Sequence, residues 1–338
     1  MKKLTCITMV TLLTAALFTG CSNSGTSLGS NKTTDNQKTL KIGITQIAPH
    51  ASLDNCREGF IKGLADAGFV DGDNITIDYK NAEGEPSNAT MITDNFVAKK
   101  YDMICAIATP TAMAAFNSTQ GTDIPVIFTA VSDPVSAELV KSLEAPETNC
   151  TGTSDALPLE QQMQLIRAMM PDAKTIGILY TTSEVNSLTH LEKFEELAPT
   201  YGFTIEAVGV NVASDIPLAM DNLVTKCDVI NNFTDNNVVN NLDTVLAKAN
   251  DAGIPVFGSE QEQVKKGCVA AQNIDYYELG ITTGKMAGKV LNGEDISKMP
   301  VEVISACTPV ANQEALDRFS LSITDEYKDS VTYLTAGE

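Results

Sequence analysis

Two segments place a helix-capping side chain next to a proline at the end of an apolar run, a pattern that suits the binding of a carboxylate. Thr109-Pro110-Thr111 follows the run Met103–Ala108, and Ser132-Asp133-Pro134 follows the run that ends at Val131. Thr109 suits the N-cap of a helix and Pro110 its first position, and the second segment repeats this pattern. The first backbone N–H groups of a helix have no partner within the helix and attract anions. We therefore expect both segments to line a ligand site.

Further polar side chains follow other strands that the sequence predicts. Ligands of open α/β sheets bind just beyond the carboxyl ends of the strands, so these side chains are binding candidates. Taken singly, each is more often a helix cap or a turn former. Taken together, several acids with few basic residues near them favour an ammonium group, and with the helix N-terminus they fit a zwitterionic amino acid. The candidates are Gln46, His50, Thr109, Thr111, Ser132, Asp133, Ser154, Asp155, Glu184, Asn186, Ser187, Asp235, Asn236, Ser259, Asn273 and Asp275.

Residue types that would support catalysis or metal binding are sparse. The chain has two histidines, His50 and His190, and no C-x-x-C pair, and no G-x-S-x-G nucleophile motif follows His50 and Asp54. Neither glycine-rich phosphate motif occurs after a strand. We therefore expect a protein that is not an enzyme and that holds no metal and no cofactor. The six cysteines that lie beyond the first 21 residues are expected to be buried, unpaired thiols: Cys56, Cys105, Cys150, Cys227, Cys268 and Cys307.

The composition is that of a globular protein too large for one ordinary core. The chain has 338 residues, of which 43% are hydrophobic and 20% charged, so two domains are expected. Asp and Glu total 43 against 23 Lys and Arg, which gives a formal net charge of −20. This excess of negative charge argues against binding nucleic acid or an anionic membrane surface through overall charge.

The first residues resemble a bacterial lipoprotein leader. Met1-Lys2-Lys3 is basic, and Ile7–Phe18 is apolar but too short to span a bilayer. Phe18-Thr19-Gly20-Cys21 resembles the lipobox, in which the cysteine receives a lipid. We expect a signal peptide over 1–20, lipidation of Cys21 and a flexible tether over 21–39, which would hold the protein at the extracytoplasmic face of the cell membrane. An uncleaved anchor and an ordinary signal peptide are the alternatives.

From Leu40 onward, short apolar runs alternate with segments of helical period. A strand over Leu40–Gln46 and a helix over Leu53–Ala67 open a βαβ series, and a strand over Thr175–Tyr180 opens a second one. Met103–Ala108 is apolar throughout, as in a strand buried on both faces of a parallel sheet. The predicted fold class is α/β, with two doubly wound parallel-sheet (Rossmann-like) lobes and a ligand cleft between them.

Several of these stretches, in combination, resemble the substrate-binding proteins of ABC transporters of the tryptophan or aromatic amino acid type. The resemblance runs from about Lys41 to about Leu321 and rests on stretches that include IATPTA, FTAVSDPV, YTTSEVNS and IDYYELG. It implies a type I periplasmic-binding-protein fold with a hinge of three crossings. Lobe one is then expected at 40–151 plus 274–303, and lobe two at 152–273 plus 304–330. Closure of the lobes would trap a ligand.

The same resemblance implies an extracytoplasmic solute receptor that binds an aromatic L-amino acid (Trp, Tyr or Phe) and delivers it to a permease and its ATPase. We expect a monomer that binds no nucleic acid. The turn at Thr109 would hold the ligand carboxylate, and Asp155, Asp235 or Asp275 the ammonium. Asp155 is favoured because it lies by the first crossing between the lobes. Two alternatives stay open: a surface adhesin or ligand sensor on the same fold, and a lipid-anchored hydrolase.

Overall fold

The computed structural model describes residues 39–304 and 307–335. The signal peptide predicted over 1–20, the lipidation site at Cys21 and the tether as far as residue 38 lie outside the described residues. In the part of the chain that is described, no helix is both long and apolar enough to cross a membrane.

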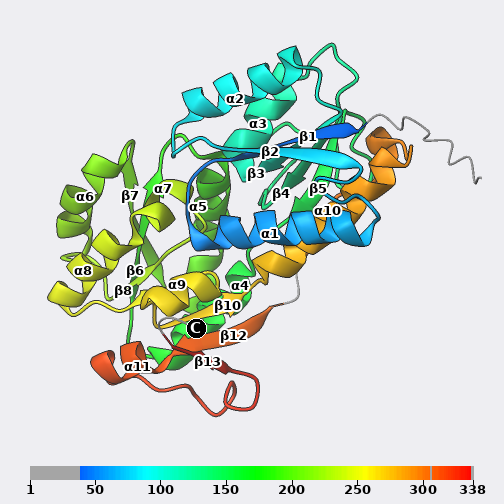
Figure 1. The fold of residues 1–338 in the computed structure, drawn as a ribbon. Helices are drawn as coiled ribbons and strands as arrows, with labels where there is room; N and C mark the ends of the chain where they lie inside the picture. The colour runs from blue at the N-terminus through cyan, green and yellow to red at the C-terminus, as the bar shows by residue number, and fades with distance from the viewer. Residues whose placement is uncertain (1–38, 305–306, 336–338) are drawn as a thin grey trace, which may run out of the picture. The chain divides into compact units, whose positions relative to one another are not determined.

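Lobe one is built on six strands: β1 (Leu40–Gln46), β2 (Ile75–Asn81), β3 (Met103–Ile107), β4 (Val126–Thr129), β5 (Cys150–Ser154) and β11 (Glu302–Val303). They pair in parallel in the order β11-β5-β4-β3-β1-β2 (Figure 1). Along β3, Cys105 and Ile107 belong to the core on one side of the sheet, and Ile104 and Ala106 to the core on the other. Both faces are covered, which explains the unbroken apolar run in the sequence.

Two pairs of helices cover the faces of this sheet: α1 (Ala51–Asp66) with α10 (Tyr276–Leu291), and α2 (Pro86–Ala98) with α3 (Thr109–Ser118) (Figure 1). Phe60 of α1 and Met286 of α10 pack into one core, and Phe96 of α2 and Ala115 of α3 into the other. Helix α10 comes from far along the chain, so lobe one is formed from two separate segments of the sequence.

Lobe two contains a second parallel sheet, formed by β6 (Thr175–Thr181), β7 (Thr204–Val210), β8 (Val229–Asn231) and β9 (Val256–Phe257) in the order β7-β6-β8-β9. Phe194 and Phe233 meet edge-on in its core, with 5.3 Å between their ring centroids. Its helices are α4 (Leu159–Met169), α5 (Val185–Leu197), α6 (Ile216–Leu223), α7 (Asn236–Asn240), α8 (Leu242–Ala252) and α9 (Gln261–Lys266). The lobe thus repeats the βαβ series of lobe one, as the sequence predicts.

A small third sheet departs from the predicted parallel pattern. It consists of β10 (Ala270–Asn273), β12 (Thr308–Asn312) and β13 (Thr332–Leu334), and β10 runs antiparallel to β12. These strands are short and carry polar residues such as Gln272 and Asn312, so they lack the apolar run that marks a buried parallel strand. The shorter elements are α11 (Gln313–Phe319) and the 3₁₀ turns η1 (Ala198–Tyr201), η2 (Ala213–Asp215) and η3 (Ile296–Lys298).

The chain crosses between the lobes three times. It leaves lobe one after β5, returns between β10 and α10, and leaves again between β11 and β12. Together with the two parallel sheets, this arrangement confirms the predicted fold class, in which two doubly wound lobes are joined by a hinge of three crossings.

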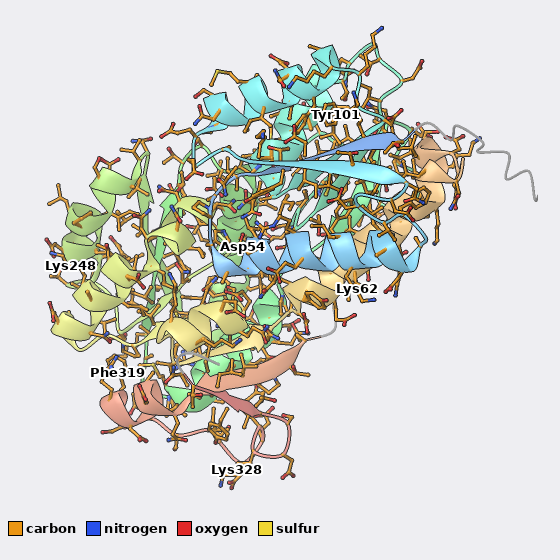
Figure 2. The ribbon with its side chains drawn as sticks, viewed as in Figure 1. Asp54, Lys62, Tyr101, Lys248, Phe319 and Lys328 are labelled. Carbon is orange, nitrogen blue, oxygen red and sulfur yellow. The ribbon has the colours of Figure 1, made fainter. Side chains whose placement is uncertain are left out.

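Burial follows the chemistry of the side chains. The six cysteines of the described chain are unpaired, as predicted, and five of them are buried. Most lysines lie at the surface, and Lys62 and Lys328 project from the ribbon in Figure 2. Lys62 pairs with Asp66, and Lys328 with Asp325. Exposed pairs of this kind contribute little to stability, so the fold rests on the cores inside the lobes.

Helices α1 and α10 touch through their backbones. A Cβ atom on Gly59 would lie 2.1 Å from the carbonyl oxygen of Tyr277, and one on Gly284 would lie 2.3 Å from that of Phe60. Such distances exclude any side chain at these positions, so glycine is what permits the approach. The contact fixes the position of each helix relative to the other, and with it the position of their first turns.

Candidate functional site

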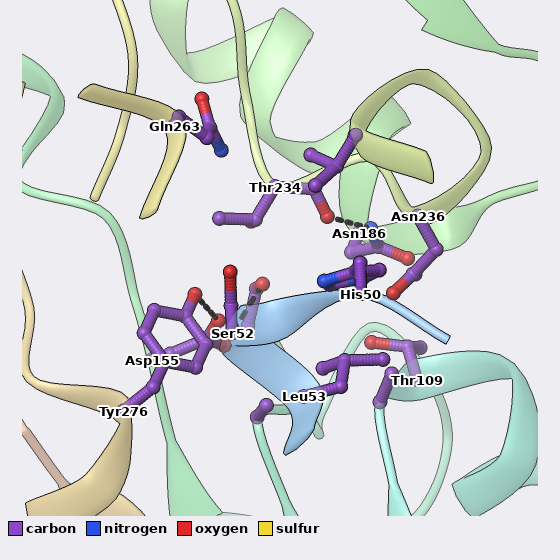
Figure 3. Close-up of a pocket in the computed structure, with 14 residues that line it drawn as sticks. His50, Ser52, Leu53, Thr109, Asp155, Asn186, Thr234, Asn236, Gln263 and Tyr276 are labelled. Atoms are coloured by element: carbon purple, nitrogen blue, oxygen red, sulfur yellow. Dashed lines mark hydrogen bonds between the residues drawn. The ribbon is translucent and has the colours of Figure 1, made fainter. Parts of the chain in front are cut away.

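A cavity of about 330 Å³ lies between the strand ends of the two lobes (Figure 3). Lobe one contributes the segments that follow β1, β3, β4 and β5, where ligands of open α/β sheets bind. This space is partly open to solvent, and the polar groups of its lining suit a small polar molecule. The lining residues are His50, Ser52, Leu53, Ala108, Thr109, Ala130, Ser132, Asp155, Asn186, Thr234, Asn236, Val239, Gln263 and Tyr276.

Five buried polar atoms of the cavity wall have no hydrogen-bond partner. They are Thr109 Oγ1, Thr234 Oγ1, Asn186 Oδ1 and both ring nitrogens of His50. Elsewhere in the described chain, four other buried side-chain atoms lack a hydrogen-bond partner. Buried polar groups nearly always have partners, so this concentration marks a place where another molecule completes the hydrogen bonds.

Asp155 is the acidic residue of the cavity lining. Its Oδ1 accepts a hydrogen bond from Ser132 Oγ at 3.0 Å, and its Oδ2 accepts one from the hydroxyl of Tyr276 at 2.5 Å. Burial raises the pKa of Asp155, and these two hydrogen bonds lower it in part. Because both neighbours donate, the geometry fits the ionised carboxylate, which can bind a cationic group of a ligand.

His50 precedes α1 and turns its ring into the cavity. Both ring nitrogens are buried, although the residue as a whole is partly exposed. Burial lowers the pKa of His50 to about 4, and the neighbouring side chain of Asn236, which lies outside hydrogen-bond geometry, raises it only in part. At neutral pH the imidazole is therefore uncharged and presents one donor and one acceptor nitrogen.

Two buried carboxylates stand behind the wall that lobe two contributes. Asp235 caps α7 by accepting the backbone N–H of Val238 at 2.9 Å, and it also accepts the hydroxyl of Ser187 at 2.7 Å. Burial, and then the nearby charge of Asp235, raise the pKa of Glu184. Glu184 itself lines a wider groove, which adjoins the cavity and shares Thr109 and Asn236 with it.

The start of α3 differs from the sequence prediction. Its N-cap is Ala108 and not Thr109, so Thr109 and Pro110 are the first two residues of the helix. Ala108 has a φ of 80°, and Ala130, just after β4, has a φ of 55°. Residues other than glycine seldom adopt such values, which strain the backbone. Both alanines line the cavity, so the strain lies where a ligand would bind.

The segment Ser132-Asp133-Pro134 does not open a helix, contrary to the prediction. Asp133 Oδ1 accepts the backbone N–H of Ser136 at 2.9 Å in a turn, and its Oδ2 lies 3.1 Å from Lys193 Nζ of lobe two. Asp133 therefore makes an ion pair between the lobes, and Ser132 is the residue of this segment that reaches the cavity.

The structure brings six of the predicted ligand residues together in the cavity wall: His50, Thr109, Ser132, Asp155, Asn186 and Asn236. The other predicted residues form internal hydrogen bonds and do not line the cavity: Gln46, Thr111, Asp133, Ser154, Glu184, Ser187, Asp235, Ser259, Asn273 and Asp275. Thr111, for example, donates to the carbonyl of Ile107 at 2.6 Å, and Asp275 caps α10. Caps and turns are the common roles of these residue types.

Sequence reasoning misses eight lining residues: Ser52, Leu53, Ala108, Ala130, Thr234, Val239, Gln263 and Tyr276. Thr234 and Tyr276 carry a usable signal, because each adjoins a predicted residue near a strand end. Gln263 and Val239 carry none, since they lie within helices and reach the cavity only through the way the lobes fold and meet.

The sequence and the fold are similar to those of known proteins. Residues 41–332 match the family model for ABC transporter substrate binding proteins. The chain is 39% identical to a tyrosine-binding protein of Clostridioides difficile, and the match covers 100% of this chain and 97% of the relative.

Two solved structures extend this similarity. An ABC domain from Streptococcus pneumoniae in complex with L-Trp is 35% identical with a TM-score of 0.85, over 88% of this chain and 99% of the other. A ligand-free, open structure of a Clostridium difficile substrate-binding protein with adhesive properties is 40% identical with a TM-score of 0.67, over the same shares. These likenesses confirm the type I periplasmic-binding-protein fold. With a family model that matches most of its length, the chain belongs to the ABC transporter substrate-binding proteins.

Proposed function

We propose that this protein is the extracytoplasmic receptor of an ABC importer for an aromatic L-amino acid (Tyr, Trp or Phe), which it delivers to the permease without catalysing a reaction. The observation that carries this proposal is the cavity between the lobes, whose wall holds one carboxylate and five buried polar atoms without partners. Two similar proteins support the ligand class, since one is named for tyrosine and the other contains L-Trp.

Charge orients the ligand in this proposal. Asp155 receives the ammonium group, because it is the carboxylate of the lining. The hydroxyl of Thr109 and the free N–H groups at the start of α3 receive the carboxylate, because a helix N-terminus attracts anions. Leu53 and Val239 offer apolar surface for the ring.

A ligand panel tests this function on the soluble body that begins at about Lys38. L-Tyr, L-Trp or L-Phe should raise the free energy of unfolding by about 2.7 kcal/mol at 100 times the Kd, because a ligand that binds only the native state stabilises it. Thermal shift screens the panel and calorimetry measures the Kd, with myo-inositol and a nucleoside as controls. A response to the controls alone would exclude the amino acid class.

The lobe boundaries belong to this proposal. We place lobe one at 40–151 plus 274–303 and lobe two at 152–273 plus 304–330, with the three crossings as the hinge. Rotation at the hinge would open the cavity for the ligand, and the transporter would distinguish the closed form. Asp133 and Lys193, 3.1 Å apart across the cleft, support the closed arrangement.

We also propose that the mature protein is a lipid-anchored monomer. Cys21 carries the lipid that holds the mature, monomeric protein at the membrane, as the Phe18-Thr19-Gly20-Cys21 match indicates. Metabolic labelling with a palmitate analogue tests this: label should enter the full-length wild type and not Cys21→Ser. Equal labelling of both proteins would contradict the lipobox.

Adhesion is the second candidate function. It is favoured by the 40% identity to a substrate-binding protein with adhesive properties. The soluble body should then bind host-cell surfaces in a saturable way. Binding equal to that of an unrelated protein of similar charge would remove this candidate and leave the transport function untouched.

A further inference from the structure

Glu184 stands just before α5, with its carboxylate inside a ring of donors. Its Oε2 accepts hydrogen bonds from Asn186 Nδ2 at 3.1 Å, from Asn236 Nδ2 at 2.7 Å and from the backbone N–H of Asn236 at 3.0 Å. Its Oε1 accepts the backbone N–H of Asn237 at 3.1 Å. The residue is 7% exposed, and no part of it lines the cavity. Glu184 thus holds two side chains that do line the cavity.

These bonds decide which way the amide of Asn186 faces. Its Nδ2 donates to Glu184 and also to the carbonyl oxygen of Thr234 at 3.2 Å, a bond marked in Figure 3. Both partners are acceptors, so the nitrogen must point toward them. The amide oxygen, Asn186 Oδ1, is left buried in the cavity wall without a partner. It is therefore an acceptor held ready for an N–H or O–H group of the ligand.

We propose that Glu184 is a positioning residue for ligand binding, which acts by fixing the amide of Asn186 so that its oxygen faces the ligand. This rests on the proposed function only for the identity of the ligand. Two other roles are compatible with the same contacts: Glu184 as a cap of α7 that serves stability alone, and Glu184 as a negative charge that attracts the ligand. The three roles predict different results for two substitutions.

Glu184→Gln and Glu184→Ala separate orientation from charge. In the glutamine variant the amide oxygen can take the place of Oε2, which has three donors, and the amide nitrogen then faces the single donor of Asn237. Asn186 stays oriented although the carboxylate is gone. The alanine variant removes the carboxylate and its hydrogen bond, so only the Thr234 carbonyl and the Ser187 hydroxyl still restrain the amide of Asn186, which can then turn more easily.

Calorimetry with the bound aromatic amino acid measures the outcome. Glu184→Ala should weaken binding about 10- to 150-fold, as expected for loss of a hydrogen bond to a charged group, and Glu184→Gln should stay within about threefold of wild type. In an Asn186→Ala background the effect of Glu184→Ala should shrink, because the two residues act as a unit. A Gln variant as weak as the Ala variant would overturn the proposal in favour of charge.

Asp228→Ala is the matched control. The Asp228 carboxylate also accepts two backbone N–H groups in lobe two, those of Lys174 at 2.7 Å and Thr175 at 2.9 Å, but at the start of β6, the end remote from the cavity. Its removal should lower the free energy of unfolding and leave the affinity unchanged. If Glu184→Ala behaves in the same way, Glu184 is a cap and the proposal is wrong.

A measurement without ligand makes the inference independent of the proposed function. In the ligand-free protein, the side-chain NH₂ protons of Asn186 should exchange slowly, because they are bonded to Glu184, Thr234 and Ser187. Glu184→Ala should lower this protection, and Glu184→Gln should keep it. Nuclear magnetic resonance detects the signals, and Asn186→Ala assigns them. Unchanged protection in Glu184→Ala would overturn the inference, whereas failure of every aromatic amino acid to bind wild type would overturn only the proposed function.

Discussion

Substitution of Asp155 should weaken ligand binding without lowering the stability of the fold. Asp155→Asn keeps the shape of the side chain but removes the charge that we assign to the ligand ammonium, so affinity should fall roughly 10- to 150-fold. Asp275, which caps α10 by accepting the N–H groups of Tyr277 and Glu278, makes the comparison. Asp275→Ala should lower the free energy of unfolding by about 0.5–2 kcal/mol and leave affinity unchanged.

Calorimetry and denaturant unfolding of the ligand-free proteins check both expectations. Wild-type affinity in Asp155→Asn, together with a loss of stability, would make Asp155 a structural residue and place the ammonium site elsewhere.

His190 should make the protein sensitive to acid. Burial lowers its pKa to about 3, below the ordinary value of 6.5, so the unfolded state binds more protons than the folded state between these values. The stabilisation is complete above pH 6.5 and is lost as the pH falls toward 3, by about 1.4 kcal/mol for each pH unit. His190→Gln should flatten this part of the pH profile.

Urea unfolding from pH 7 to pH 3.5 measures the two profiles. Their difference isolates His190, because His50 and the buried Glu184 and Glu260 titrate in both proteins. The glutamates act with the opposite sign, since burial raises their pKa and their contribution falls as the pH rises. Parallel profiles would show that His190 has no lowered pKa.

Residue types and their places in the sequence located only part of the cavity wall. Asp155 and Thr109 follow buried strands, and the rule that ligands bind at strand ends finds such residues. The same rule also selects Asp235 and Ser187, which bond to each other at 2.7 Å behind the wall. A cap and a ligand contact look alike in sequence, and only the packing of the side chain distinguishes them.

At the scale of elements, the contact between α1 and α10 should tolerate no added side chain. Gly284→Ala would place a Cβ 2.3 Å from the carbonyl oxygen of Phe60, so the helices must separate, and overpacking of this kind costs about 1–3 kcal/mol. Because Tyr276 begins α10 and bonds to Asp155, ligand affinity should fall as well. Lys285→Ala, at the exposed next position of α10, should change neither quantity.

Denaturant unfolding and calorimetry on the two variants measure these effects. Full stability in Gly284→Ala would mean that the helices can move apart freely, and the backbone contact would then not define the lobe.

The same contact shows why the sequence predicts some elements better than others. Strand β1 is predicted over Leu40–Gln46, as found, because its apolar pattern is local. The glycines of α10 lower helix propensity, yet in the folded protein they are what allows the helix to dock. The antiparallel sheet of β10 and β12 joins segments far apart in sequence, and the residues of neither segment predict the pairing.

At the scale of the whole molecule, the structure resembles a ligand-bound relative more than an open, ligand-free one. The structure matches the L-Trp complex with a TM-score of 0.85 and the ligand-free, open structure with 0.67, although the latter protein is the more similar in sequence. Closure without a ligand leaves five polar atoms of the cavity unpartnered, at about 1–3 kcal/mol each when buried. The empty protein should therefore open in solution.

Small-angle scattering tests this expectation. The radius of gyration should decrease when the bound aromatic amino acid is added, and it should not change with myo-inositol. An unchanged radius with a ligand that calorimetry shows to bind would mean that the lobes stay closed when empty.

The glycine contact between α1 and α10 also limits which residues can be substituted to change the ligand specificity of this receptor. Helices α1 and α10, which touch through their backbones, position Ser52, Leu53 and Tyr276 in the cavity wall. Substitutions that change the distance between the two helices should destabilise the fold before they change ligand selectivity. The wall from lobe two takes no part in this contact. A search for new specificities, by directed evolution or in the design of a fluorescent biosensor, should therefore begin at Thr234 and Val239, and not at Gln263, whose side chain bonds to Ser259 and Phe233.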